Sequence, residues 1–135
     1  MSDFDPNKHS YFTRDEILMG RDKQHPITPE QSDNLDDLIR ALNPVRHLYG
    51  APLFLSSGYR PSMINSNVGG AKRSAHMQCQ AVDIIDKDGL IANWVLNHLT
   101  LLEENGIFME DPRYTKGWIH LDIRGPKSGK RVFIP

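Results

Sequence analysis

Apolar side chains recur at intervals of three and four residues between residues 28 and 50, which predicts a helix with one buried face. The residues on this face are Leu35, Leu38, Leu42, Val45 and Tyr49. Thr28 and Gln31 have the spacing of a capping box at the start of the helix, and Gly50 can end it. Pro44 is expected to kink or divide the helix, because proline has no backbone N–H to donate.

Two further helices follow from similar patterns. Thr13 and Glu16 have the spacing of another capping box, which predicts a short helix near the start of the chain. Residues 90–106 carry apolar side chains at helical spacing and finish with Gly106, which predicts one long helix.

Three short apolar runs, at residues 51–58, 81–85 and 118–123, are typical of strands. Helices come first along the chain, and strands follow with one crossing helix between them. This order predicts a small α+β domain. The length of 135 residues suits one domain with a single core, so residues 1–135 are expected to form one unit.

Composition narrows the classes of protein that fit. Net charge is −1, which argues against nucleic acid as the partner. No run approaches the roughly 20 apolar residues that span a bilayer, so no membrane insertion is expected. The first ten residues have no apolar core and no small-residue cleavage site, which predicts synthesis in the cytoplasm without a signal peptide.

The single cysteine, Cys79, excludes an internal disulfide and a four-cysteine zinc site. Any metal site must therefore use histidine and carboxylate ligands. From residue 113 onward the chain is strongly basic, with Asp122 as its one acid. This segment is either a solvated terminus or a face that turns toward an anionic polymer.

Alternation along two predicted strands places polar side chains away from the core. Trp118, His120 and Asp122 alternate with apolar residues in the last strand, and Asp83 alternates with its apolar neighbours in the strand before it. If these strands pair, Asp83 and His120 project from one face of the sheet. His76 would reach the same face from the preceding loop.

Two imidazoles and one carboxylate form a three-ligand set that leaves the fourth position of a zinc ion open. An open position holds a water with a pKa of about 7, which hydrolysis needs. The same spacing also fits a hydrogen-bonded strand histidine and an ordinary loop histidine. The residues alone leave both interpretations open.

The stretch "LSSGYRPSMINSNVGGAKRSAHMQCQAVDI" and the later "GWIHLDI" resemble the zinc D,D-carboxypeptidase and L-alanyl-D-glutamate peptidase family. These enzymes cut peptidoglycan peptides and share a fold with the hedgehog signalling domain. The shared pattern is a Ser-Gly-Tyr-Arg turn, a Gly-Gly segment, Ser-x-His with Asp seven residues after the His, and a late Trp-x-His. The resemblance implies a small antiparallel sheet with N-terminal helices and one long crossing helix.

The resemblance also implies roles for individual residues. The zinc ligands it implies are His76, Asp83 and His120. Arg60 matches the arginine over the substrate, where a guanidinium can hold a peptide carboxylate or carbonyl and stabilise an oxyanion. Ser74 matches a serine that contacts substrate, and Trp118 is expected to line the groove because it shares the face of His120.

The chain departs from the family pattern at Gly117. Many members carry an acid three residues before the last histidine, as general base for the water, and Gly117 cannot serve. The candidates that replace it are Glu110, Asp111 and Asp122, with Glu110 slightly favoured. Asp122 is either a base or a carboxylate that orients His120.

Cys79 stands where the family usually has glycine. Cysteine is larger and less tolerant of a positive φ. Its thiol is either a small buried side chain or, if the segment is extended, a group near the metal.

These features predict zinc-dependent hydrolysis of peptidoglycan stem peptides, at a D-Ala-D-Ala or an L-Ala-D-Glu bond. The alternative is a noncatalytic metal-binding module that recognises cell-wall peptide, such as a structural component of a phage particle. "FTRDEIL" and "PVRHLYGAPLFLSSGYR" resemble the version found in phage and prophage proteins. This implies a monomeric endolysin that acts at the bacterial cell wall, after release through a holin or as part of a virion.

Overall fold

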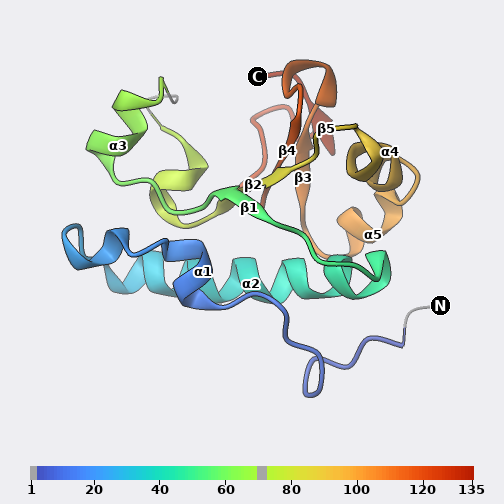
Figure 1. The fold of residues 1–135 in the computed structure, drawn as a ribbon, viewed down its shortest axis with the longest axis horizontal. Helices are drawn as coiled ribbons and strands as arrows, with labels where there is room; N and C mark the ends of the chain where they lie inside the picture. The colour runs from blue at the N-terminus through green and yellow to red at the C-terminus, as the bar shows by residue number, and fades with distance from the viewer. Residues whose placement is uncertain (1–2, 70–72) are drawn as a thin grey trace.

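The computed structural model describes residues 3–69 and 73–135, which form a mixed α+β fold (Figure 1). The helices are α1 (Arg14–Leu18), α2 (Pro29–Tyr49), α3 (Ser62–Asn67), α4 (Leu90–Leu96) and α5 (Leu99–Glu104). The described residues also form short 3-10 helices, which are η1 (Arg21–Lys23), η2 (Ala75–Gln78) and η3 (Pro112–Tyr114). The strands are β1 (Leu55–Ser57), β2 (Ala81–Ile85), β3 (Phe108–Glu110), β4 (Trp118–Asp122) and β5 (Val132–Phe133). The predicted fold class is confirmed.

The strands in the described part of the chain form one sheet in the order β1-β2-β4-β3-β5. Its central pairs are antiparallel, as predicted, but β5 runs parallel to β3. The sheet is therefore antiparallel as expected except at one edge, where β5 adds a short parallel strand. The sequence did not predict β3 and β5, because segments of three and two residues are too short to show alternation.

Both predicted capping boxes form. The Thr13 and Thr28 hydroxyls each accept a hydrogen bond, 3.1 Å long, from the backbone N–H of Glu16 and of Gln31. In return, the side chains of Glu16 and Gln31 accept hydrogen bonds from the backbone N–H groups of Thr13 and Thr28. These contacts satisfy N–H groups that have no partner within a helix, and so fix where α1 and α2 begin.

Pro44 lies inside α2 without dividing it. A proline in a helix interior destabilises it by about 3 kcal/mol. Leu35, Leu38, Leu42 and Val45 are all at most 2% exposed on the core face of this helix. Full burial of each such side chain contributes about 1.5–3 kcal/mol, so the packed face outweighs the effect of the proline.

The predicted long helix at residues 90–106 is divided into α4 and α5. The chain breaks at Asn97 and His98, and His98 has φ −133° and ψ 35°, outside the helical range. The backbone N–H of His98 donates to Val95, and its ring Nδ1 lies 2.7 Å from the carbonyl oxygen of Trp94. These bonds tighten the last turn of α4 and end it, so the expectation of one crossing helix is corrected.

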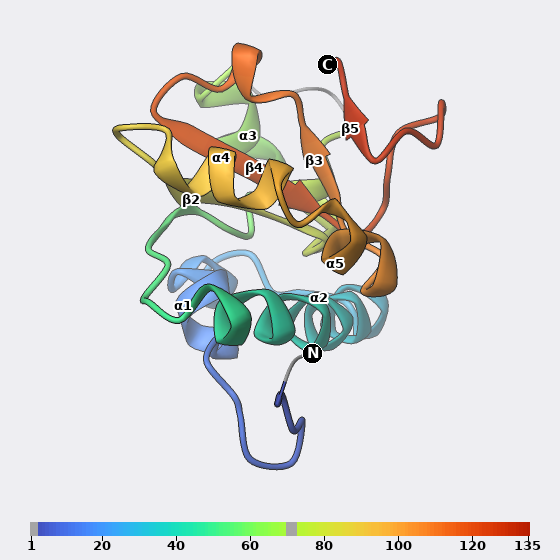
Figure 2. The same ribbon diagram turned by 90° about the vertical axis from the view of Figure 1, so that its right-hand side faces the viewer.

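The core lies on one face of the sheet. Val82 and Ile84 of β2, with Ile119 and Leu121 of β4, are completely buried against the helices. In Figures 1 and 2 the long helix α2 runs along one side of the sheet, and α4 packs against β4. The strand alternation predicted from the sequence is confirmed, and the other sheet face is left for polar side chains. No helix among the described residues is long and apolar enough to cross a membrane.

Candidate metal centre

The pairing of β2 and β4 brings the first two predicted ligands together. Their antiparallel register places Asp83 directly opposite His120. Directly opposed residues of an antiparallel pair point to the same face of the sheet. Because the neighbours of both residues are buried in the core, Asp83 and His120 project from the opposite face.

His76 reaches this face from η2, just before β2. The Ser74 hydroxyl caps η2 by accepting a hydrogen bond from the backbone N–H of His76, 3.2 Å long. Cys79 ends η2 in the left-handed region, at φ 59°. This tight turn brings the chain back into β2, so that His76 and Asp83 face each other.

Cys79 is completely buried within the hydrophobic core. Burial raises the pKa of its thiol to about 11, so the group is neutral at physiological pH. Among the described residues, the group that could hold a metal contains His76, Asp83 and His120 and does not include this cysteine. The interpretation of Cys79 as a small buried side chain is the one that the structure supports.

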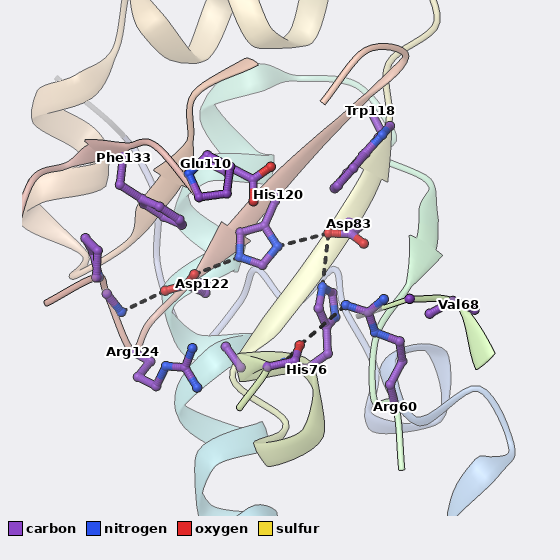
Figure 3. A pocket seen from close by; sticks show the side chains of 16 residues that line it. Arg60, Val68, His76, Asp83, Glu110, Trp118, His120, Asp122, Arg124 and Phe133 are labelled. Carbon is purple, nitrogen blue, oxygen red and sulfur yellow. Dashed lines mark hydrogen bonds and ion pairs between the residues drawn. The ribbon is translucent and has the colours of Figure 1, made fainter. Parts of the chain in front are cut away.

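The ligand atoms of the three residues converge on one point (Figure 3). Asp83 Oδ1 lies 3.1 Å from His76 Nε2 and 3.1 Å from His120 Nδ1. One ligand atom from each residue lies within 4.8 Å of the others. Zinc bonds of about 2.0–2.2 Å in a tetrahedron separate ligand atoms by about 3.3–3.6 Å. The arrangement therefore fits a metal of this size.

The outer ring nitrogens have partners that accept protons. His76 Nδ1 lies 2.9 Å from the Gly58 carbonyl oxygen, and His120 Nε2 lies 2.7 Å from Asp122 Oδ2. A carbonyl or carboxylate oxygen only accepts here, so each of these nitrogens carries the hydrogen. In the neutral rings the lone pairs then lie on His76 Nε2 and His120 Nδ1, which both face Asp83. Such outer partners are typical of metal-binding histidines.

Gly58 belongs to the Ser-Gly-Tyr-Arg turn and lies against α1. A Cβ atom there would lie 2.2 Å from the carbonyl oxygen of Ile17, which is impossible without movement of the backbone. The next residue, Tyr59, donates its backbone N–H to that same carbonyl. Glycine at this position lets the turn pack closely enough to present its own carbonyl to His76. Gly70, in the predicted Gly-Gly segment, lies outside the described residues.

The charges at the centre are strongly coupled. Burial opposes ionisation of Asp83, but hydrogen bonds and charge from His120 and His76 outweigh it and lower the pKa of Asp83 to about 2. Burial also opposes protonation of His120, yet the carboxylates of Asp122 and Asp83 raise the pKa of His120 to about 9. The metal-free centre therefore holds a proton on His120 at neutral pH, and a metal must displace it.

The centre lies in a pocket with a volume of about 550 Å³. The structure brings together in it almost the whole predicted site: Arg60, Ser74, His76, Asp83, Glu110, Trp118, His120 and Asp122. Asp111, the remaining candidate base, is not part of the lining. It forms an ion pair with Arg113 instead, 2.7 Å long.

Glu110 ends β3 and points its carboxylate into the pocket beside His120 (Figure 3). Burial and the carboxylates of Asp83 and Asp122 raise the pKa of Glu110, while His120 acts in the opposite direction. No hydrogen bond engages this carboxylate within the described part of the chain. Glu110 is therefore free to accept a proton in the pocket.

Asp122 has partners for both carboxylate oxygens. One accepts from His120 Nε2, and the other accepts from the backbone N–H of Gly125, 2.7 Å away. Gly117, where the family acid is missing, has φ 89°, a conformation that disfavours any side chain. Of the three candidate bases, Glu110 is the one whose carboxylate is both in the pocket and unengaged.

Arg60 is tied to the centre through its own backbone. Its N–H donates to the carbonyl oxygen of His76, and its guanidinium donates to the Ser74 hydroxyl over 3.4 Å. Its Nε is buried and has no hydrogen-bond partner among the described residues. The Asp83 carboxylate attracts the Arg60 cation, but these two side chains do not form an ion pair. Donor capacity therefore remains beside the metal centre.

Residues near the C-terminus also line the pocket, and sequence reasoning missed them: Arg124, Gly125, Pro126, Phe133 and Pro135. Val68, after α3, lines it as well. No local pattern marks these residues, because it is the turn after β4 and the pairing of β5 that bring them to the site.

Comparison with protein families adds an independent finding. The model of the family described as peptidase M15 matches residues 10–122, which include His76, Asp83 and His120. The chain belongs to the peptidase M15 family, which confirms the family resemblance seen in the sequence. Membership indicates a metallopeptidase. A search of curated proteins finds no match.

Proposed function

We propose that this protein is a zinc-dependent peptidase that hydrolyses peptide bonds in peptidoglycan stem peptides. The observation that carries the proposal is the convergence of His76 Nε2, His120 Nδ1 and Asp83 Oδ1 in an open pocket. Three nitrogen and oxygen ligands with one open position are the donor set of a catalytic zinc site. Zinc bound there would polarise a peptide carbonyl and lower the pKa of a water molecule to about 7.

Glu110 is the general base. Its carboxylate faces the pocket without a competing hydrogen bond in the described chain, and its raised pKa suits a group that takes up and releases a proton. It accepts a proton from the attacking water and returns it to the leaving amine. Glu110 thus takes the role for which Gly117 has no side chain.

Arg60 binds the substrate. Its guanidinium lies beside Asp83 and keeps unused donors, which suits a peptide carboxylate or the oxygen that gains charge during attack. The Ser74 hydroxyl accepts hydrogen bonds from the Arg60 guanidinium and from the backbone N–H of His76, and so links the two residues. Trp118 forms the pocket wall on the Asp83 side (Figure 3).

Asp122 orients a ligand. Its bond to His120 Nε2 fixes the tautomer in which Nδ1 faces Asp83 and increases the basicity of the ring. This role fits the enclosed position of Asp122, which is 4% exposed. The base and the orienting carboxylate are then two different residues, Glu110 and Asp122.

The proposal extends to the biological setting. One domain, residues 1–135, carries the whole site and acts as a monomer on the cell wall, in the manner of an endolysin. Analytical ultracentrifugation tests the monomer. To test the wall as the place of action, the protein is added to bacteria whose outer membrane has been permeabilised, and lysis is measured.

Mass spectrometry of peptidoglycan tests the activity. Purified peptidoglycan is incubated with zinc-loaded protein, with EDTA-treated protein and with the Glu110→Gln variant. New fragments in the first sample alone support the proposal, and their masses identify the bond. If zinc binds at one per chain and no fragments form, the noncatalytic module that binds cell-wall peptide becomes the better interpretation.

A further inference from the structure

We infer that Arg124 forms a second carboxylate-binding subsite, at the end of the pocket opposite Arg60. This inference rests on the proposed peptidase function and names its substrate more narrowly. The second subsite would select peptides that carry a carboxylate on each side of the bond that is cut.

Arg124 and Arg60 lie on opposite sides of the metal centre. Both line the pocket. In Figure 3, Arg60 lies on the same side of His120 as Asp83, and Arg124 lies on the other side, with Phe133. The Phe133 ring contacts His120 edge-on, with ring centroids 6.0 Å apart, which places this end of the pocket directly beside a ligand.

The turn that carries Arg124 is fixed relative to the metal centre. The backbone N–H of Gly125 donates to the same Asp122 carboxylate that orients His120. A Cβ atom on Gly125 would lie 2.8 Å from the Phe108 ring, so the turn packs tightly on β3. The Arg124 guanidinium also donates through Nη1 to the carbonyl oxygen of Arg73. The contacts of Gly125 fix the turn, and the bond to Arg73 orients the exposed Arg124 guanidinium before substrate arrives.

The Arg124 guanidinium has unused capacity for an anion. It has five N–H donors, and within the described chain only the bond to the Arg73 carbonyl is made. No carboxylate in that part of the structure forms an ion pair with it, and both oxygens of the nearby Asp122 have other donors. Pro126 and Phe133 supply apolar walls nearby. A planar cation in such a setting matches a carboxylate, which accepts two parallel hydrogen bonds from arginine.

The position of the two arginines limits which bond can be cut. The carbonyl under attack must lie at the metal centre, so the peptide extends toward Arg60 on one side and toward Arg124 on the other. A D-Ala-D-Ala bond has a terminal carboxylate after it, and diaminopimelate at the third residue supplies a side-chain carboxylate before it. An L-Ala-D-Glu bond has free carboxylates only on its D-Glu side. The paired arginines therefore favour the D-Ala-D-Ala bond of diaminopimelate peptides.

Two pentapeptides test the subsite because they differ in one carboxylate. They have the sequence L-Ala-γ-D-Glu-X-D-Ala-D-Ala, with X either meso-diaminopimelate or L-lysine. Release of D-alanine is measured for the zinc-loaded wild-type protein and for Arg124→Gln, Arg124→Lys and Lys127→Gln. Lys127 is a matched control, because it is exposed in the same segment and does not line the pocket.

The wild-type protein is expected to prefer the diaminopimelate peptide by about five- to tenfold in kcat/KM, mainly through a lower KM. This size is typical of one charge-assisted hydrogen-bonded pair at a partly solvated site. The preference should disappear in Arg124→Gln, weaken in Arg124→Lys and persist in Lys127→Gln. Equal rates on both peptides in the wild type would overturn the inference. So would an equal loss on both peptides in Arg124→Gln, or cleavage at the L-Ala-D-Glu bond.

A binding measurement separates this inference from the proposed activity. Calorimetry of both peptides with zinc-loaded Glu110→Gln protein reports selection without turnover. If the wild type cleaves neither peptide but the variant binds the diaminopimelate peptide more tightly, the subsite stands and the peptidase activity is wrong. If the wild type cleaves both peptides equally and binding is also equal, the activity stands and the subsite is wrong. If the protein shows neither cleavage nor selective binding, both the peptidase activity and the subsite are wrong.

Discussion

Asp83 and His120 are direct partners across β2 and β4, and their side chains meet at 3.1 Å on the sheet face away from the core. The sheet therefore fixes two of the three side chains that could hold a metal by backbone hydrogen bonds and not by flexible loops. A slip of either strand by one residue would turn its side chain, Asp83 or His120, to the core face and separate the two. The buried residues Val82, Ile84, Ile119 and Leu121 prevent such a slip, so packing of the core also maintains the metal centre.

The first prediction concerns the carboxylate behind His120. Asp122→Asn keeps the shape of the side chain but weakens the acceptor for His120 Nε2. Zinc affinity is expected to fall by about 10- to 100-fold, as for other carboxylates behind metal-bound histidines. Competition with a chromogenic chelator measures the change, and excess zinc should restore much of the activity. Activity lost at full zinc occupancy would instead make Asp122 the general base.

The second prediction separates the base from the ligands. Glu110→Gln removes the proton acceptor but touches none of the three converging residues. We expect kcat to fall by about 10²–10⁴-fold, the usual contribution of a general base, while one zinc per chain remains bound. Glu103→Gln, at an exposed position outside the pocket, is the matched control and should keep full activity. Full turnover in Glu110→Gln would show that another group accepts the proton.

The third prediction follows from the charge on His120 in the metal-free protein. The folded pKa of His120, about 9, is above its ordinary value of 6.5. Protonation therefore stabilises the fold fully below about pH 6.5, and this contribution is lost as pH rises through about 9. The free energy of unfolding of EDTA-treated protein should fall over this range, by at most about 1.4 kcal/mol per pH unit for one proton.

Urea unfolding at several pH values checks this dependence. The His120→Gln variant is the control, and the decline between pH 6.5 and 9 should be absent from it. Asp83 contributes in the acidic range with the opposite sign. Its pKa is lowered to about 2, so its stabilisation is present above its ordinary value of 3.8 and is lost as pH falls toward 2. A wild-type curve that is flat between pH 6.5 and 9 would contradict the coupling of His120 to its two carboxylates.

The sequence predicted that Asp83 and His120 share one face of the sheet because strand alternation has a period of two. Once Val82 and Ile84 face the core, Asp83 must face away, and the same holds for His120 between its apolar neighbours. His76 needed the family pattern, because a loop residue has no periodic signal. The proposed choice of Glu110 over Asp122 rests on side-chain contacts that the sequence does not show, since both residues carry a carboxylate near His120.

Other features depend on contacts between distant segments. The strand β3 has only three residues and becomes recognisable through its pairing with β4. Arg124 looks like one of several basic residues near the C-terminus until the turn after β4 is seen to close on Asp122. The break between α4 and α5 depends on side-chain bonds of Asn97 and His98 to the preceding turn, which competed with a strong apolar periodicity.

The last prediction tests whether the packing of a single glycine maintains the metal centre. Gly58→Ala places a Cβ atom 2.2 Å from the Ile17 carbonyl oxygen, so the turn must move away from α1. Overpacking of this kind costs about 1–3 kcal/mol. The Gly58 carbonyl also accepts the hydrogen of His76 Nδ1, so the movement should misplace this ligand. We expect both a lower free energy of unfolding in urea and weaker zinc binding.

Gly129→Ala is the control for this change. Gly129 has φ 73° and open space around its Cα, so alanine there reports the general effect of replacing a glycine with positive φ. It should lower the unfolding free energy by about 1 kcal/mol and leave zinc affinity unchanged. If Gly58→Ala weakens the fold without changing zinc affinity, the Gly58 carbonyl is not what holds His76. If neither property changes, the close contact with Ile17 is relieved by a small local shift, and the turn tolerates a side chain.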